Sequence, residues 1–274
     1  HGAAYYWKGK IPAAVFYTAV PFGMTAQEIN GWLHYGDGLA LWRELYAPFG
    51  VIPFAGGRTG VQMAGWFNQE LRRADDLKGL KMRIPGLAGE VFDASGGTAV
   101  RIAGGEVYTS MQPGVIDAVE WVGPYNDRTL GLNEVAEYYY YPGWHEPGAM
   151  LEFTVNEQAL SALPRDLQAI VEYAARAANQ NMLDEFTARN NESLRTLLAS
   201  GTKLRALPDD VLQVLYDNSL VALDALVEND PMAQKIAKSY KAFAEDVRAY
   251  HEISERAFLN ARDKVLPPVN FSGQ

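Results

Sequence analysis

The sequence predicts an α/β fold followed by a long helical region, and three observations support this. Short apolar stretches alternate with helical stretches between residues 51 and 122, as in a domain built around a largely parallel sheet. Glycines and prolines separate these stretches by short loops. After Pro164, apolar residues recur at helical spacing with almost no helix breaker. A chain of 274 residues is also long enough for two domains.

The first 60 residues are rich in glycine, proline and aromatic residues. Short buried strands are expected at 13–17 and 51–54. Thr25 and Glu28 have the spacing of a capping box, which predicts a helix that runs to about Leu45. The glycine cluster at 56–60 lacks the Gly-Lys-Ser/Thr ending of a phosphate loop, so it is interpreted as a turn or hinge.

The remaining elements follow from the same patterns. Four consecutive tyrosines at 138–141 are expected to form an aromatic strand packed in a core. The last predicted helix is long, and its apolar face offers an interface to a partner. We expect strands at 81–84, 99–102 and 118–122, and helices at 89–95, 104–111, 165–200, 209–228 and 231–266.

Composition excludes several classes of function. The net charge of -9 argues against nucleic-acid binding, which needs a basic surface. The absence of cysteine rules out disulfides and thiolate chemistry, and it fits an oxidising compartment. No run approaches the roughly 18–20 apolar residues that span a bilayer. The chain begins with His1 rather than methionine, so a longer precursor that has been cut or truncated is expected, and the absence of a secretory signal here is uninformative.

Three charged residues stand in apolar surroundings: Arg83 on a short predicted strand, and Glu120 and Glu146 within aromatic runs. Buried charges are costly unless they have partners. An arginine fork can hold a carboxylate through two parallel hydrogen bonds, and two carboxylates can hold a cation. The sequence therefore predicts an organic anion bound together with a metal ion. A structural ion pair and a strand-end salt bridge are the alternative interpretations of Arg83 and Glu120.

A hard cation takes oxygen ligands, and Gln62, which follows the glycine cluster, is a candidate amide ligand. Softer metals are disfavoured because no cysteine is present and the four histidines are scattered. His145 is interpreted as a packing or rim residue. The paired acids also allow a hydrolase that uses Glu120 and Glu146. A nearby arginine disfavours this alternative, because it would keep both acids ionised.

Several stretches strongly resemble the solute-binding proteins of TRAP transporters of the DctP type. The region from residue 120 to Glu146 resembles the branch of that family that binds 2-oxo acids such as pyruvate, or lactate, with a metal ion. The likeness covers essentially the whole chain and is most specific over residues 56–148. The stretches that carry it are DLKGLKMR at 76–83, GGEVY at 104–108, QPGVIDA at 112–118 and EWVGPYND at 120–127.

The resemblance implies a periplasmic receptor rather than an enzyme, with a type II periplasmic-binding-protein fold in which two α/β domains close over the ligand. Arg83 matches the arginine that clamps the substrate carboxylate. A sodium or calcium ion would then bind the substrate's carboxylate and its keto or hydroxyl oxygen. The matching cation ligands are Gln62, Glu120, the backbone carbonyl of Trp121, and Glu146. Trp121 and Tyr6 would line the apolar end of the ligand, and Asn126 is a further polar contact. A receptor for another organic acid or a polyol, without a metal, is the alternative within the same class.

The resemblance also implies an organisation. Residues 1–60 and 150–195 would form one domain, and residues 61–149 and 196–274 the other with the C-terminal helices. The family normally has a strand-helix-strand segment before the position of His1, so part of the first domain is expected to lie outside this sequence. The partners would be the TRAP membrane permease subunits and a second copy of the chain, bound through the helix near 240–266.

Overall fold

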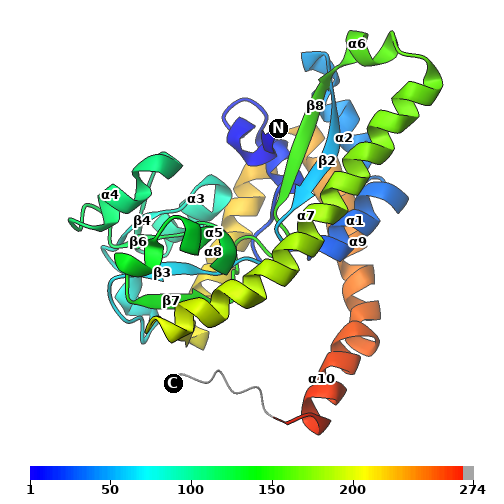
Figure 1. Cartoon of the computed structure of the whole chain (residues 1–274). Coiled ribbons are helices and arrows are strands. Elements are labelled where there is room, and N and C mark those ends of the chain that lie inside the picture. Colours follow the sequence, from blue (N-terminus) through cyan, green and yellow to red (C-terminus); the bar gives the residue numbers. More distant parts are fainter. Residues whose placement is uncertain (268–274) are drawn as a thin grey trace.

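Two separate sheets organise the fold, and each is the centre of its own body (Figure 1). The computed structural model describes residues 1–267. The smaller sheet, at the centre of what we call the first body, is antiparallel, with the order β1-β8-β2. Its strands are β1 (Gly2–Ala3), β2 (Val51–Arg58) and β8 (Met150–Asn156).

The larger sheet, at the centre of the second body, has the order β5-β4-β6-β3-β7-β9. Strands β5, β4 and β6 are parallel, as are β7 and β9, whereas β3 runs antiparallel to both of its neighbours. The expected largely parallel sheet is thus confirmed on either side of one reversed strand. The strands are β3 (Gly65–Phe67), β4 (Lys81–Arg83), β5 (Thr98–Val100), β6 (Ala118–Val119), β7 (Tyr138–Tyr141) and β9 (Lys203–Ala206).

Two predictions for the first body are wrong. The stretch expected as a strand at 13–17 is a 3-10 helix, Pro12–Tyr17. It begins at a proline and is buried on all sides, so its pattern could not distinguish helix from strand. The helix expected to run to Leu45 divides into α1 (Ala26–Tyr35) and α2 (Gly38–Tyr46). The break allows close packing, because a Cβ at Gly38 would lie 2.7 Å from the Trp32 ring.

The first two glycines of the cluster at 56–60 lie in a strand rather than in a turn, so for Gly56 and Gly57 the predicted turn is wrong. Strand β2 continues through Gly56 and Gly57 to Arg58, with a register shift between Ala55 and Gly57. A side chain at Gly56 would collide with the ring of Phe153, and a Cβ at Gly57 would lie 2.5 Å from Met182 Sδ. The glycines therefore serve close approach of β8 and of the long helix rather than a change of direction.

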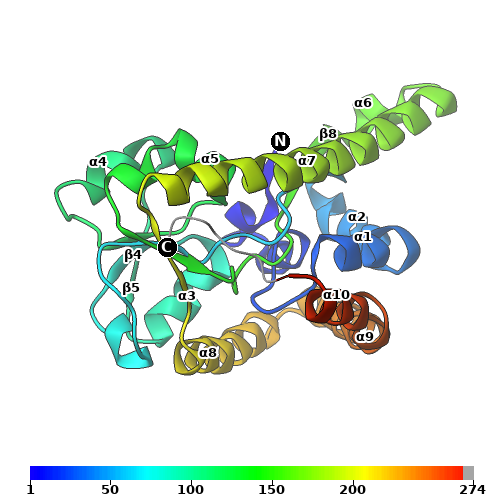
Figure 2. The ribbon, with the colours of Figure 1, turned by 60° about the horizontal axis from the view of Figure 1, so that its bottom comes forward.

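Helices cover the larger sheet and connect the two bodies. Helix α7 (Arg165–Ala199) packs on β2 at one end and on α5 at the other, so it spans both bodies (Figures 1 and 2). Helix α8 (Asp209–Val227) packs on α3. The remaining helices of this region are α3 (Gly86–Ala94), α4 (Val107–Met111), α5 (Pro124–Thr129) and α6 (Glu157–Ser161).

The last predicted helix is interrupted. It forms α9 (Pro231–Ile253) and α10 (Glu255–Val265), which separate at Ser254 and follow one another end to end in Figure 1. Helix α9 buries Ile236 and Tyr240 in the core of the first body, although residues 196–274 were expected with the second. Residues 268–274 of that predicted domain lie outside the described residues, and the division into two domains stays a prediction. Among the described helices, none combines the length and the hydropathy needed to cross a membrane.

Candidate anion and cation site

Arg83 and Glu120 meet because β4 and β6 are parallel neighbours. Arg83 pairs with Val119 across the ladder, so Glu120 follows directly at the same edge of the sheet. Arg83 Nη1 donates hydrogen bonds to the carbonyl oxygen of Glu120 at 3.0 Å and to its Oε2 at 3.2 Å. The guanidinium also lies 4.9 Å from the centre of the Trp121 ring. Both charged side chains are buried. The structure therefore places in contact two residues that the sequence analysis had expected to lie near each other.

Glu146 and Gln62 lie close together because the loop after β7, which carries Glu146, forms backbone hydrogen bonds with the segment after β2, which carries Gln62. The Gly143 N–H donates to the Gln62 carbonyl oxygen at 3.0 Å, and the Gln62 N–H donates to the Glu146 carbonyl oxygen at 3.2 Å. Gly143 has no room for a side chain, because a Cβ would overlap the Gln62 backbone. The Gln62 side-chain amide then donates to Glu146 Oε2 at 2.7 Å. Gln62 Oε1 is buried without a hydrogen-bond partner among the described residues.

His145 joins this cluster, although it was interpreted as a packing or rim residue. Its side chain is fully buried, and Nε2 lies 3.4 Å from Glu120 Oε1. One ligand atom each from Glu120, His145 and Glu146 lies within 4.8 Å of the others. Neither ring nitrogen forms a hydrogen bond with a described residue, and burial lowers the pKa of His145 to about 4, so the ring is neutral. The only feature of the sequence that pointed to a role for His145 in this cluster was its position beside Glu146.

The cluster places two acids, Glu120 and Glu146, against the single cationic side chain of Arg83. Burial raises the pKa of Glu120 to about 8, although Arg83 opposes this shift. Burial and the neighbouring Glu120 raise the pKa of Glu146 to about 8. When both acids are ionised, two negative charges face one guanidinium and a neutral imidazole. A cation would balance the excess, and the oxygens of Glu120, Glu146 and Gln62 fit a hard ion such as sodium or calcium.

A cavity of about 570 Å³ adjoins Arg83 and Trp121. Tyr5 and Tyr6 close it from the first body, so residues of both bodies line it. The exposed fraction of Tyr6 is 64%. Tyr5 was not predicted; burial and the nearby acids Glu146 and Glu120 raise its pKa. Asn126 lies on α5 and does not line this cavity, but its Oδ1 is buried without a partner among the described residues.

Asp127 holds the segment that presents Glu120 and Trp121. Its buried carboxylate accepts hydrogen bonds from the N–H groups of Val122 and Gly123 at 3.0 and 2.9 Å. It also accepts bonds from Trp66 Nε1 at 3.0 Å and the Tyr139 hydroxyl at 2.7 Å. Burial outweighs these donors and raises the pKa of Asp127 to about 7. Sequence reasoning missed this residue because its partners come from three separate strands and loops.

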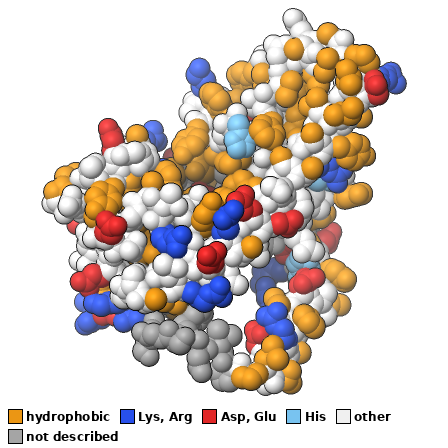
Figure 3. Space-filling view, in the orientation of Figure 1, with side chains coloured by type: hydrophobic (Ala, Val, Ile, Leu, Met, Phe, Trp, Pro, Cys, Tyr) orange, Lys and Arg blue, Asp and Glu red, His pale blue; other side chains and the backbone are white. Residues whose placement is uncertain are grey.

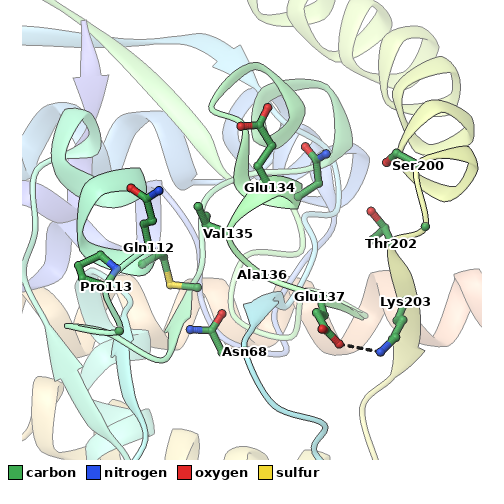
Figure 4. Close-up of a pocket in the computed structure, with 14 residues that line it drawn as sticks. Asn68, Gln112, Pro113, Glu134, Val135, Ala136, Glu137, Ser200, Thr202 and Lys203 are labelled. Carbon is green, nitrogen blue, oxygen red and sulfur yellow. Dashed lines mark hydrogen bonds and ion pairs between the residues drawn. The ribbon is translucent and has the colours of Figure 1, made fainter.

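A second hollow, of about 760 Å³, lies at the other end of the larger sheet (Figure 4). Its lining includes Asn68, which follows β3, and Lys203 at the start of β9. Lys203 forms an exposed ion pair with Glu137 at 2.6 Å. Because β3 is antiparallel to its neighbours, this edge is opposite to the edge that carries Arg83 and Glu120. The hollow therefore lies apart from the buried charged cluster.

Comparisons with known proteins agree on one family. Residues 1–230 match the model of the DctP family, described as bacterial extracellular solute-binding protein, family 7. A monocarboxylate 2-oxoacid-binding periplasmic protein of Nostoc sp. is 44% identical over 260 residues, which cover 95% of this chain and 71% of that protein.

Solved structures give the same result. A TRAP periplasmic solute-binding protein of Colwellia psychrerythraea with bound calcium and pyruvate has a TM-score of 0.92 and 41% identity, covering 95% of this chain and 80% of that one. A protein of the same description from Pseudoalteromonas atlantica, with bound sodium and pyruvate, has a TM-score of 0.90 and 43% identity, covering 95% and 79%. A TRAP solute-binding protein of Bordetella bronchiseptica, a mixed-occupancy dimer with calcium and picolinate, has a TM-score of 0.92 and 38% identity, covering 95% and 77%.

Proposed function

Because this chain belongs to the DctP family of TRAP-transporter solute-binding proteins, we propose that it is the periplasmic receptor for a small 2-oxo or 2-hydroxy monocarboxylate such as pyruvate or lactate. The acid binds together with a sodium or calcium ion, as pyruvate does in the relatives from Colwellia and Pseudoalteromonas. The observation that carries the proposal is the buried cluster in which Arg83 faces Glu120 and a second acid, Glu146, beside a cavity.

The two ends of the acid have different partners in this proposal. The fork of Arg83 holds the carboxylate through charge-assisted hydrogen bonds. Gln62, Glu120, Glu146 and the backbone carbonyl of Trp121 hold the cation. The cation in turn binds the carboxylate and the adjacent keto or hydroxyl oxygen, which gives selectivity for acids with an oxygen on the second carbon.

The cavity wall supplies the remaining contacts. The Trp121 ring and Tyr6 line the apolar end of the acid, and both border the cavity. Asn126 does not line the cavity, so a polar contact from its unpartnered Oδ1 on α5 stays a prediction. Because Tyr6 belongs to the first body and Arg83 to the second, the acid is held between the bodies and stabilises their closed arrangement.

Members of this family are receptors and not enzymes, so the hydrolase alternative is set aside. The receptor delivers its ligand to the TRAP membrane permease. Delivery in the periplasm requires export, which we attribute to a secretory signal on the precursor.

We also propose a homodimer that forms through α10. None of its residues is buried, although Phe258 and Leu259 are 63% and 41% exposed. Figure 3 shows apolar side chains over this helix. An exposed apolar helix face of this kind commonly marks a protein interface. Sedimentation of Phe258→Asp protein should give a monomer where the unaltered chain gives a dimer, and an unchanged mass would exclude this interface.

Calorimetric titration of refolded, ligand-free protein with pyruvate tests the receptor function. Binding should be tight with sodium or calcium present and absent after chelation in a sodium-free buffer. Glu146→Gln should need far more calcium for the same binding, while Glu137→Gln, which changes an exposed acid, should bind as the unaltered protein does. Tight binding without any ion would favour the metal-free alternative. Recovery of unchanged pyruvate distinguishes a receptor from an enzyme.

A further inference from the structure

His145 is a buried polar side chain that the proposed cation site leaves unused. The side chain is closed to solvent, and neither ring nitrogen has a hydrogen-bond partner among residues 1–267. Most buried polar groups in folded proteins are paired. Nε2 faces an acid, because it lies 3.4 Å from Glu120 Oε1. This separation exceeds the usual hydrogen-bond length of about 2.7–3.2 Å, so a bond to the acid does not account for the ring.

The separation of this nitrogen and oxygen matches two ligands of one tetrahedral ion. Zinc binds histidine nitrogen and carboxylate oxygen at about 2.1 Å, so two of its ligands at the tetrahedral angle lie about 3.4 Å apart. Arg83 donates to the other oxygen of Glu120, which leaves Oε1 on the side of His145.

Glu146 supplies a third ligand atom. One atom each from Glu120, His145 and Glu146 lies within 4.8 Å of the others, so small side-chain movements bring all three to one ion. A cavity of about 10 Å³ borders His145 and Glu146, which is about the smallest volume that holds a water-sized particle. Three protein ligands with an open fourth position are the usual arrangement of a zinc site that also binds water or a substrate.

The nitrogen distinguishes zinc from calcium at this position. Calcium takes oxygen ligands, whereas imidazole suits zinc and related transition ions. The distance alone does not separate the two ions, because ligands at about 2.4 Å from calcium and at a right angle also lie about 3.4 Å apart. Zinc and calcium carry the same charge, so either ion balances Glu120 and Glu146 equally well.

We propose that zinc, or a transition ion of the same class, binds this receptor in place of sodium or calcium, with His145 Nε2, Glu120 and Glu146 as its ligands. The inference rests on the proposed function for the place of the cation, and the acid or water supplies the fourth ligand. The sequence disfavoured such metals because the four histidines are scattered. The structure removes this objection, because one histidine lies beside two acids. Zinc and calcium therefore compete for a single site.

Titration with zinc alone, without any acid, tests the inference directly. One zinc ion should bind each chain and displace calcium. His145→Asn should weaken zinc binding at least tenfold more than it weakens calcium binding, because only zinc loses a direct ligand. Residual calcium binding shows that this variant is folded. His34→Asn, which changes a histidine on α1, provides the matched control and should alter neither affinity.

Nuclear magnetic resonance of ¹⁵N-labelled histidine gives a signature that a merely structural role would not produce. One equivalent of zinc should shift the ring-nitrogen signal that is missing from His145→Asn. The signals of the other three histidines should stay in place.

The outcomes separate this inference from the proposed function. Zinc that shifts only the signal of His1, or that binds His145→Asn unchanged, would be an adventitious ion only and would overturn the inference. Equal losses of zinc and calcium affinity in His145→Asn would also overturn it, because His145 would then only orient the acids. Zinc that binds without displacing calcium would lie outside the cluster, with the same consequence. Titration of the calcium-loaded protein with pyruvate tests the proposed function separately, so each can fail alone.

Discussion

Replacement of Arg83 by glutamine would test the anion-binding part of the proposed site separately from its cation-binding part. Arg83 Nη1 donates to the Glu120 carbonyl oxygen and to its Oε2, 3.0 and 3.2 Å away, within a buried pair. In the proposed complex Arg83 forms a buried charge pair with the carboxylate of the acid, and truncation of one partner in a buried pair across a binding interface costs about 2–5 kcal/mol. Since about 1.4 kcal/mol corresponds to a tenfold change in Kd, pyruvate affinity in saturating calcium should fall roughly thirty-fold to several thousand-fold. Calorimetric titration measures this loss directly.

The same substitution should act differently on the cation. Arg83 repels a cation held by Glu120 and Glu146, by about 3 kcal/mol per unit charge at roughly 5 Å and an effective dielectric constant of about 20. Removal of the guanidinium also favours protonation of the two acids, which competes with calcium. A proton carries half the charge of calcium, so each bound proton gains less from the removal than the calcium ion does. Calcium affinity measured without acid should therefore not weaken in Arg83→Gln. Parallel losses of calcium and pyruvate affinity, or a nearly unchanged pyruvate affinity, would refute the assignment of Arg83 as the anion clamp.

Two further predictions concern the acids and His145. Burial raises the pKa of Glu120 and Glu146 to about 8, above about 4.3 for an unfolded glutamate. In the ion-free protein the contribution of these two groups to stability should therefore be fully present below about pH 4.3 and fall by up to about 1.4 kcal/mol per pH unit for each group as the pH rises toward 8. Urea unfolding at a series of pH values should show this decrease in the free energy of unfolding, and calcium should abolish it. A free energy that does not change with pH in the absence of calcium would contradict the raised pKa values. His145→Asn removes a ring nitrogen 3.4 Å from Glu120 Oε1. Calcium affinity should then fall about tenfold to a hundredfold, since such neighbours orient metal ligands, and an unchanged affinity would exclude this role.

The sequence was sufficient for residues whose position follows from a regular strand. Arg83 and Glu120 each stand at the end of a short apolar strand, and parallel strands bring such ends together at one edge. The alternation of strands and helices between residues 51 and 122 was likewise local enough to predict. Gln62 and Glu146 were singled out as candidate cation ligands by residue type and context, the family resemblance agreed, and the structure brings them within hydrogen-bond distance.

The sequence was insufficient wherever packing overrides local preference. Gly56 and Gly57 have the composition of a turn, yet they lie within β2 because Phe153 and Met182 occupy the space of their side chains. The role of His145 depends on burial beside Glu120, which lies 25 positions earlier in the chain. Asp127 gains its importance from donors on Trp66 and Tyr139, and no local pattern reveals such partners.

The charges of the buried cluster would allow the proposed site to serve either sodium or calcium, and they give a last prediction. With both acids ionised, Glu120, Glu146, Arg83 and a bound monocarboxylate sum to two negative charges. Calcium neutralises this sum, whereas sodium leaves one negative charge, which is costly in a buried site. One acid should therefore keep a proton in the sodium complex, since both have a pKa of about 8 before the ion binds.

Near neutral pH, binding of calcium with pyruvate should release about two protons, and binding of sodium with pyruvate about one. Titrations in buffers of different ionisation enthalpy measure these numbers. Glu146→Gln provides the control, because it removes one titrating group and should lower the calcium count by about one. The same proton count with both ions would show that the cluster does not adjust its charge to the cation, and would leave the selectivity to ion size and ligand number alone.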